Sequence, residues 1–160
     1  MTKLDRTDAR MLLAMCDAPR ATGVQLAAAL GLARNTVAAR LARWDEDKVL
    51  APVDRCVSPR DLGYPLKAFI SAVVDQHRLD QVLVELETIA QVTQITGLSG
   101  AADLLIGVVA TDADDLYRVA GRVLASPGVE RTNISLVMRE LVPYRLTPLL
   151  ARVHSAHPET

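Results

Sequence analysis

Residues 22–44, TGVQLAAALGLARNTVAARLARW, constrain the fold of this chain more than any other stretch. Thr22 and Gln25 match the S/T-x-x-E/Q capping box, in which each side chain satisfies a backbone N–H at the start of a helix. Gly31 suits the left-handed conformation that ends a helix. A further helix is expected from about residue 34 to residue 47. Two helices joined by a short glycine-containing turn indicate a helix-turn-helix.

A first helix is expected over residues 5–17, with Asp5 as its cap. Its apolar stripe at helical spacing consists of Met11, Leu12, Met15 and Cys16. The buried face of the second helix is predicted to consist of Val24, Leu26, Ala27 and Leu30. The two cysteines, Cys16 and Cys56, have no metal-ligand spacing and are expected to be buried thiols.

The third helix has two chemically different faces. Val37, Leu41 and Trp44 recur at i, i+4 and i+7 and are expected to pack against the first two helices. The other side carries small, hydrogen-bonding and basic side chains, namely Arg34, Asn35, Thr36, Ala39, Arg40 and Arg43. Such a face can enter the major groove, where Asn and Arg pair with base edges and Arg also binds phosphate. The alternative is a basic face that is merely solvated.

Charge is unevenly distributed along the chain. Residues 1–60 hold 10 Lys and Arg against 7 Asp and Glu, whereas residues 61–160 hold 8 against 12. The formal net charge of −1 therefore conceals a basic first part and an acidic second part. We expect only the first part to meet a polyanion.

Several classes of protein are disfavoured by composition. No run of about 18 apolar residues is present, so no membrane span is expected. The first ten residues, MTKLDRTDAR, are too polar for a signal peptide, so we expect a cytoplasmic protein. His77, His154 and His157 lie in no catalytic or metal-binding pattern, and we expect neither enzyme activity nor a cofactor or metal.

Between residues 49 and 65 the pattern changes. Val49–Val57 is expected to form an edge strand or a short two-stranded wing, although Pro52 interrupts it. Pro59, Gly63 and Pro65 indicate a linker, which places a domain boundary near residues 58–65.

The periodicity after residue 65 alternates between strands and helices. Strands are expected over residues 66–75, 92–98, 104–110 and 129–142, with helices over 79–89 and 112–124. The order β-α-β-β-α-β is the ferredoxin-like arrangement, an antiparallel sheet with two helices on one face. The chain is then an α+β protein whose second sheet face needs a partner subunit. Residues 143–160 are expected to be a frayed tail.

The chain resembles the Lrp/AsnC, or feast/famine, family of transcription regulators. The resemblance covers about residues 4–142 and is carried by LDRTDARMLL, QLAAALGLARNTVAARLARWDEDKVL, LGYPLKAFISA, GAADLLIGV and SPGVERTNISLVMREL, in that order. It implies a winged helix-turn-helix over residues 1–60, a ferredoxin-like ligand-binding (RAM) domain over 61–145 and a tail over 146–160. It also implies binding to double-stranded DNA, a small-molecule effector such as an amino acid, and homodimers that assemble further, with an octamer expected.

The resemblance assigns the DNA contacts to the third helix and to the start of the second helix. The assigned residues are Thr22, Gln25, Arg34, Asn35, Thr36, Ala39, Arg40 and Arg43. Asn35 and Thr36 lie near the helix N-terminus, where base contacts concentrate, and Arg40 and Arg43 are expected on phosphates. Relatives usually have Ser at the position of Ala33, which caps this helix. The loss of that cap predicts a looser first turn.

The resemblance also points to an effector loop with a G-x-x-D motif. The assigned residues are Ser99, Gly100, Ala101, Ala102, Asp103 and Leu104, with Asn133 and Ser135 on the last strand. Exposed loop amides could bind a carboxylate while Asp103 accepts from an ammonium group. Ala102 and Ile134 replace the aromatic residue and the Thr that are common in the family, so ligand identity does not transfer. The alternative is a tight turn in which Asp103 is a local acceptor.

Two other functions fit parts of the pattern. One is an architectural protein that wraps DNA without an effector. The other is an enzyme similar to the tetrapyrrole decarboxylases that resemble this family. The sequence favours a ligand-responsive, sequence-specific regulator of transcription over both.

Overall fold

The computed structural model describes residues 4–156 and divides the chain into two compact units. One unit consists of Met1–Pro52 with Val142–Thr160, and the other of Val53–Leu141. No helix among the described residues is both long and apolar enough to cross a membrane.

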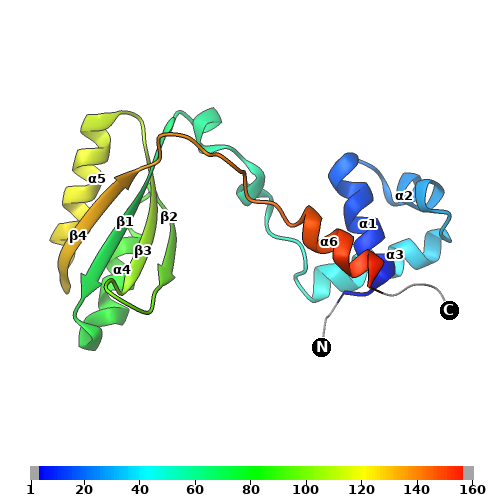
Figure 1. Ribbon diagram of the computed structural model, residues 1–160, viewed down its shortest axis with the longest axis horizontal. Helices are drawn as coiled ribbons and strands as arrows, with labels where there is room; N and C mark the ends of the chain where they lie inside the picture. The colour runs from blue at the N-terminus through cyan, green and yellow to red at the C-terminus, as the bar shows by residue number, and fades with distance from the viewer. Residues whose placement is uncertain (1–3, 157–160) are drawn as a thin grey trace. The chain divides into compact units, whose positions relative to one another are not determined.

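The first unit contains the helix-turn-helix. Its helices are α1 (Arg6–Asp17), α2 (Gly23–Leu30) and α3 (Arg34–Glu46) (Figure 1). Both α1 and α2 begin with a complete capping box. Gly31 ends α2 in the left-handed conformation, at φ 65°, as the sequence predicts. Local hydrogen bonding therefore determines where these helices start and where α2 stops.

The core of this unit is built around Trp44, which is 1% exposed. Buried around it are Met11, Leu26, Ala27 and Val37. Val24 does not join them and is 51% exposed, so its predicted place in the core is wrong. The inward side of α2 consists of Leu26 and Ala27, which are buried, with Gly23 and Leu30 half-buried at either end.

Three further expectations for this part of the chain are corrected. Cys16 and Cys56 are both exposed free thiols. Cys16 lies in the last turn of α1, and Cys56 lies in a short 3₁₀ turn outside both cores. Val49–Val57 forms no strand; Val53–Cys56 and Pro59–Leu62 are 3₁₀ turns instead. The expected wing is absent from this segment because Pro52 and the turns leave no stretch that could pair with a second strand.

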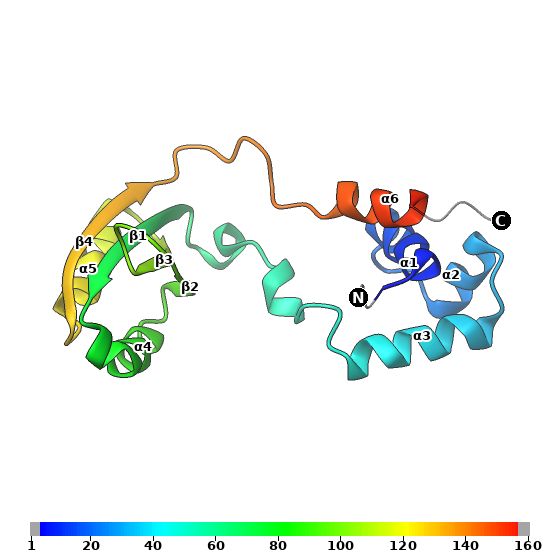
Figure 2. The same cartoon turned by 60° about the horizontal axis from the view of Figure 1, so that its bottom comes forward.

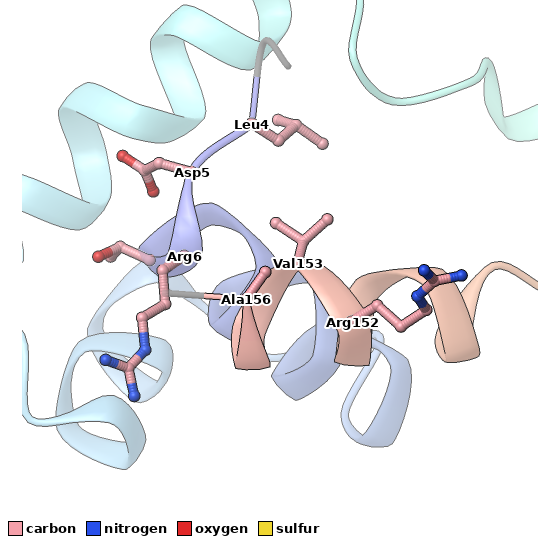
Figure 3. Close-up of a pocket in the computed structure, with 7 residues that line it drawn as sticks. Leu4, Asp5, Arg6, Arg152, Val153 and Ala156 are labelled. Carbon is pink, nitrogen blue, oxygen red and sulfur yellow. The ribbon is translucent and has the colours of Figure 1, made fainter. Parts of the chain in front are cut away.

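The C-terminal segment is helical. Helix α6 (Thr147–Ser155) runs beside α1, with α3 on the other side of α1 (Figure 2). A hollow remains between α6 and the first turn of α1, where Val153 points toward Leu4 (Figure 3). The expectation of a frayed tail is therefore wrong for residues 147–155, and residues 157–160 lie outside the described part.

The second unit is an antiparallel sheet with two helices. Its elements are β1 (Leu66–Val74), a 3₁₀ turn (Gln76–Arg78), α4 (Leu79–Glu87), β2 (Val92–Gly97), β3 (Leu104–Ala110), α5 (Ala113–Ala125) and β4 (Val129–Leu136). The strand order is β2-β3-β1-β4. The predicted βαββαβ topology is confirmed. The last strand ends at Leu136 instead of continuing to residue 142. Its last paired residue in the ladder is Ala68, and one further backbone bond, from the Val137 N–H to the Lys67 carbonyl, follows it.

The two faces of this sheet differ. Alternate residues of β1, including Ala68, Ile70 and Ala72, are buried against α4 and α5. The residues between them, Phe69, Ser71 and Val73, lie on the other face and are only half-buried. No described element of the second unit covers that face.

Candidate DNA-reading surface and effector loop

The polar side of α3 lies at the surface of the first unit. One groove there is lined by Asn35, Thr36, Ala39, Arg40 and Arg43, so the fold brings together five of the eight predicted contacts. Arg34, at the start of the helix, is exposed. It forms no ion pair with any residue in the described range 4–156. We call these six residues the reading surface.

Two of the predicted phosphate contacts are held inside the unit. Arg40 Nη1 lies 2.8 Å from Asp5 Oδ2 and 2.7 Å from Asp8 Oδ1, and Arg43 Nη2 lies 2.6 Å from Asp8 Oδ2. The indole Nε1 of Trp44 also donates to Asp8 Oδ1, at 3.2 Å. The two arginines therefore already have carboxylate partners when no DNA is present.

These contacts shift the titration of two groups. Burial alone would raise the pKa of Asp5, but hydrogen bonds from the Asp8 amide and Arg40 outweigh it, so the pKa lies below its ordinary value. Burial alone would lower the pKa of Arg40, but Asp5 and Asp8 raise it further. Both pKa shifts favour the charged forms, so the pair of Asp5 and Arg40 stays ionised at neutral pH.

Thr22 and Gln25 are exposed at the start of α2, but their polar atoms serve the capping box. Gln25 Oε1 accepts from the Thr22 N–H at 2.8 Å, and Thr22 Oγ1 accepts from the Gln25 N–H at 3.3 Å. At α3, Ala33 occupies the cap position and provides no side-chain hydrogen bond, as its residue type requires. The roles of these residues toward DNA stay predictions.

The G-x-x-D loop connects β2 to β3. The Asp103 carboxylate accepts from the Val74 N–H at 2.9 Å and from Gln76 Nε2 at 2.7 Å. Its backbone N–H also donates to Ala72 at 2.9 Å. Gly100 has a φ of 137°, which a side chain disfavours. These are the contacts of a local acceptor that holds the loop on β1, and effector binding by this loop stays a prediction.

The other predicted effector residues differ in their exposure to solvent. Ser99, Gly100 and Ala101 are exposed, whereas Ala102 is half-buried. Leu104 is 3% exposed and belongs to the core beneath α4 and α5.

Asn133 and Ser135 are exposed on β4, opposite Ser71 and Phe69, and so share the open face of the sheet with them. The predicted effector residues are thus divided among the loop, the core and that open face, and their binding of a ligand stays a prediction. Among residues 4–156, no three His, Cys, Asp or Glu side chains are grouped as a metal site would require.

Sequence reasoning correctly placed Asp5 as the cap of α1, but it missed that Asp5 and Asp8 bind the arginines of α3. Asp8 has a completely buried side chain, although it lies only two positions after the start of α1. A signal was present, because two acids on the first helix accompany two arginines spaced i, i+3 on the third. Pairing them required knowledge of how α1 and α3 cross.

Comparison with known proteins agrees with this architecture. The model of the AsnC-type helix-turn-helix domain matches residues 4–43, and that of the Lrp/AsnC ligand binding domain matches residues 67–147. The HTH-type transcriptional regulator AldR of Mycolicibacterium smegmatis is 30% identical over 142 residues, which cover 86% of this chain and 83% of AldR. A helix-turn-helix joined to a βαββαβ ligand-binding domain defines a class of DNA-binding regulators.

Solved structures share the whole fold. E. coli AsnC superposes with a TM-score of 0.80 at 22% identity, covering 92% of this chain and 100% of that chain. The complex of the Neisseria meningitidis regulator NMB0573 with L-methionine has a TM-score of 0.77 at 22% identity, covering 92% and 99%. The chain belongs to the Lrp/AsnC family and is a transcriptional regulator of that family.

Proposed function

We propose that this regulator recognises specific DNA sequences through the reading surface and responds to a small metabolite, most simply an amino acid. Ligand binding on the ferredoxin-like domain would change the assembly or the spacing of the DNA-binding units and so alter promoter occupancy. The observation that carries the proposal is the groove on α3, which gathers Asn35, Thr36, Ala39, Arg40 and Arg43 at the surface.

The chemistry of the groove supports DNA as the partner. Asn35 and Thr36 lie in the first turn of α3, where a recognition helix reads base edges. Ala39 is small enough for close approach. Arg34 has no acidic partner among residues 4–156. Arg40 and Arg43 each keep N–H groups beyond those that bind Asp5 and Asp8. Thr22 and Gln25 complete the proposed contact set on the DNA backbone.

The effector site is proposed at the G-x-x-D loop and the open face of the sheet. Ser99, Gly100 and Ala101 expose loop backbone there, and Asn133 and Ser135 add polar side chains. Two structural neighbours support an amino acid as ligand, because NMB0573 and a feast or famine regulatory protein from M. tuberculosis were both solved with L-methionine. Ala102 in the loop and Ile134 on β4 stand where the family commonly has an aromatic residue and a Thr, so ligand identity does not transfer and we do not propose methionine itself.

A second copy of the chain is the proposed partner for the open sheet face. Phe69 and Val73 lie half-buried on it, and Leu105 pairs with Ser71 on the same side. Apolar side chains on an open sheet face favour burial against another subunit. We propose a homodimer that forms a larger assembly, with an octamer as the expected state. The proposed role is non-enzymatic and cytoplasmic, in keeping with relatives that are named transcriptional regulators.

Replacing Asn35 with alanine is expected to weaken binding to a duplex that the wild-type protein selects from a random 40-base-pair pool. The loss expected for one bidentate base contact is about 1–3 kcal/mol. Binding to calf-thymus DNA should change little, since Asn35 carries no charge. Gel shifts measure both affinities, and Arg122→Ala, at an exposed position of α5, is the surface control. Equal loss on both DNAs would contradict base reading by Asn35.

An amino-acid effector is expected to raise the thermal midpoint of the protein by mass action. At a concentration of about 100 Kd the stabilisation is about 2.7 kcal/mol. A thermal-shift screen of the twenty amino acids identifies the ligand. Asn133→Ala should reduce the shift and leave the ligand-free midpoint unchanged, because Asn133 is exposed. The absence of any shift with all twenty would remove the amino-acid part of the proposal.

A further inference from the structure

We propose that Asp8 is the positioning residue of the reading surface, and that it acts through Arg40, Arg43 and Trp44. The proposal rests on the function proposed above and goes beyond it. It states what holds α3 in its reading orientation and what limits the charge that α3 offers to DNA. Asp8 itself is buried and belongs to α1, so it touches no DNA.

The Asp8 carboxylate is fully occupied. Oδ1 accepts from Arg40 Nη1 at 2.7 Å and from Trp44 Nε1 at 3.2 Å. Oδ2 accepts from Arg43 Nη2 at 2.6 Å and from the Asp5 N–H at 3.0 Å. A carboxylate offers about four lone-pair sites, and here each has a donor. A buried charge tolerates burial only when it is paired and hydrogen-bonded in this way.

The donors come from one turn of α3. Positions 40, 43 and 44 are i, i+3 and i+4, so they lie on the same side of the helix. Three donors that converge on one fixed carboxylate restrain both the rotation of α3 about its axis and its slide along α1. The reading residues Asn35 and Thr36 are carried on the same rigid helix, so Asp8 determines where they point.

The same contacts limit the free charge of the reading surface. Two guanidinium groups, of Arg40 and Arg43, face two carboxylates, of Asp5 and Asp8, so the cluster is electrically balanced. Figure 3 shows the Asp5 carboxylate turned away from α6. Arg40 and Arg43 also line the groove, so each is shared between Asp8 and the surface that would meet DNA. The DNA affinity of the wild-type protein should therefore depend on salt less steeply than it would if Arg34, Arg40 and Arg43 all bound phosphates freely.

Full-length Asp8→Asn protein tests the proposal, with Asp45→Asn as its control. Asp45 is exposed on α3 and forms no ion pair within the described range. Each of the two variants removes one carboxylate, so both change the net charge equally. Affinity is measured by fluorescence anisotropy against salt concentration, for the duplex selected by the wild-type protein and for calf-thymus DNA. Trp44 is the only tryptophan of the chain, so its emission and acrylamide quenching report the cluster directly.

Asp8→Asn is expected to steepen the salt dependence by about 0.9 in the log–log slope for each arginine that gains a phosphate. The ratio of selected to calf-thymus affinity should fall about tenfold, within the range of one base contact. Trp44 should become more accessible to acrylamide. Asp45→Asn should change none of these beyond its uniform charge effect. A role in stability alone would leave the slope and the affinity ratio of the folded variant unchanged.

An Asp8→Asn protein that is folded, with wild-type slope, affinity ratio and Trp44 quenching, overturns the proposal. If this variant loses its circular dichroism, Asp5→Asn replaces it, because asparagine is an equally good helix cap. Asp5→Asn should steepen the slope by up to about 0.9, and a result equal to Asp45→Asn overturns the proposal. A wild-type protein that selects no duplex from the pool overturns the proposed function instead, and the inference with it.

Discussion

Replacing Gly128 with alanine is expected to lower the free energy of unfolding of the ferredoxin-like unit by about 2–5 kcal/mol. Gly128 has a φ of 102°, a conformation that side chains rarely adopt. An added Cβ would lie 2.8 Å from Val82 Cγ2 and 3.2 Å from Arg78 Cβ. Val82 is completely buried between α4 and the sheet, so it has no room to move away. Backbone strain and overpacking therefore add at this position.

Urea unfolding followed by far-UV circular dichroism measures this effect at fixed protein concentration. Trp44 fluorescence reports the helix-turn-helix unit, so its transition should stay in place while the other moves. Gly121→Ala is the matched control, because Gly121 lies in α5 with nothing within 4 Å of an added Cβ. Alanine favours a helix by about 1 kcal/mol over glycine, so the control should be neutral or stabilised. Equal behaviour of the two variants would contradict the steric explanation.

Replacing Trp44 with alanine is expected to cost the helix-turn-helix unit about 3–5 kcal/mol, the usual effect of truncating a buried aromatic residue. Trp44 is the largest fully buried side chain of the chain's described part. Its loss opens a cavity among Met11, Leu26 and Val37 and also removes one donor from the buried Asp8 carboxylate. Specific DNA binding should be lost with the fold of this unit.

Thermal unfolding by circular dichroism measures the cost of this truncation. Trp44→Phe separates its two parts, because phenylalanine fills most of the cavity and lacks the N–H group. It should cost clearly less than alanine. Tyr144→Ala is the control, since Tyr144 is 87% exposed and its truncation should change the midpoint little. A Trp44→Ala protein with a wild-type midpoint would show that Trp44 does not hold this core together.

Much of the fold was predictable because the signals are local. Thr22 and Gln25 sit three residues apart and cap the same turn, so no tertiary information is needed to place the start of α2. The strands and helices of residues 66–136 follow from periodicity, which shows in any short window. Two of the errors concern segments whose structure depends on a distant neighbour. Residues 147–155 form a helix beside α1, and Val49–Val57 has no strand with which to pair.

For the candidate site, too, the sequence predicted the local features but not the contacts between distant segments. The exposure of Asn35, Thr36 and Ala39 follows from their place on an amphipathic helix, so the wheel alone predicts it. The wheel also exposes Arg40 and Arg43, but it cannot show that both reach across to α1. Likewise the G-x-x-D motif predicts a turn, while the bonds from Val74 and Gln76 to Asp103 depend on β1 lying beside β3.

The order of amino acids alone determined the helix-turn-helix, the βαββαβ topology and the residues offered on the outer side of the third helix. Only the tertiary structure decided that the Asp8 carboxylate accepts hydrogen bonds from three side chains that lie 32 to 36 positions further along the chain. The physical reason is the separation along the sequence between the residues that interact. Caps and periodic faces result from contacts within one or two turns, whereas the surroundings of Asp8 exist only after two helices have packed against each other.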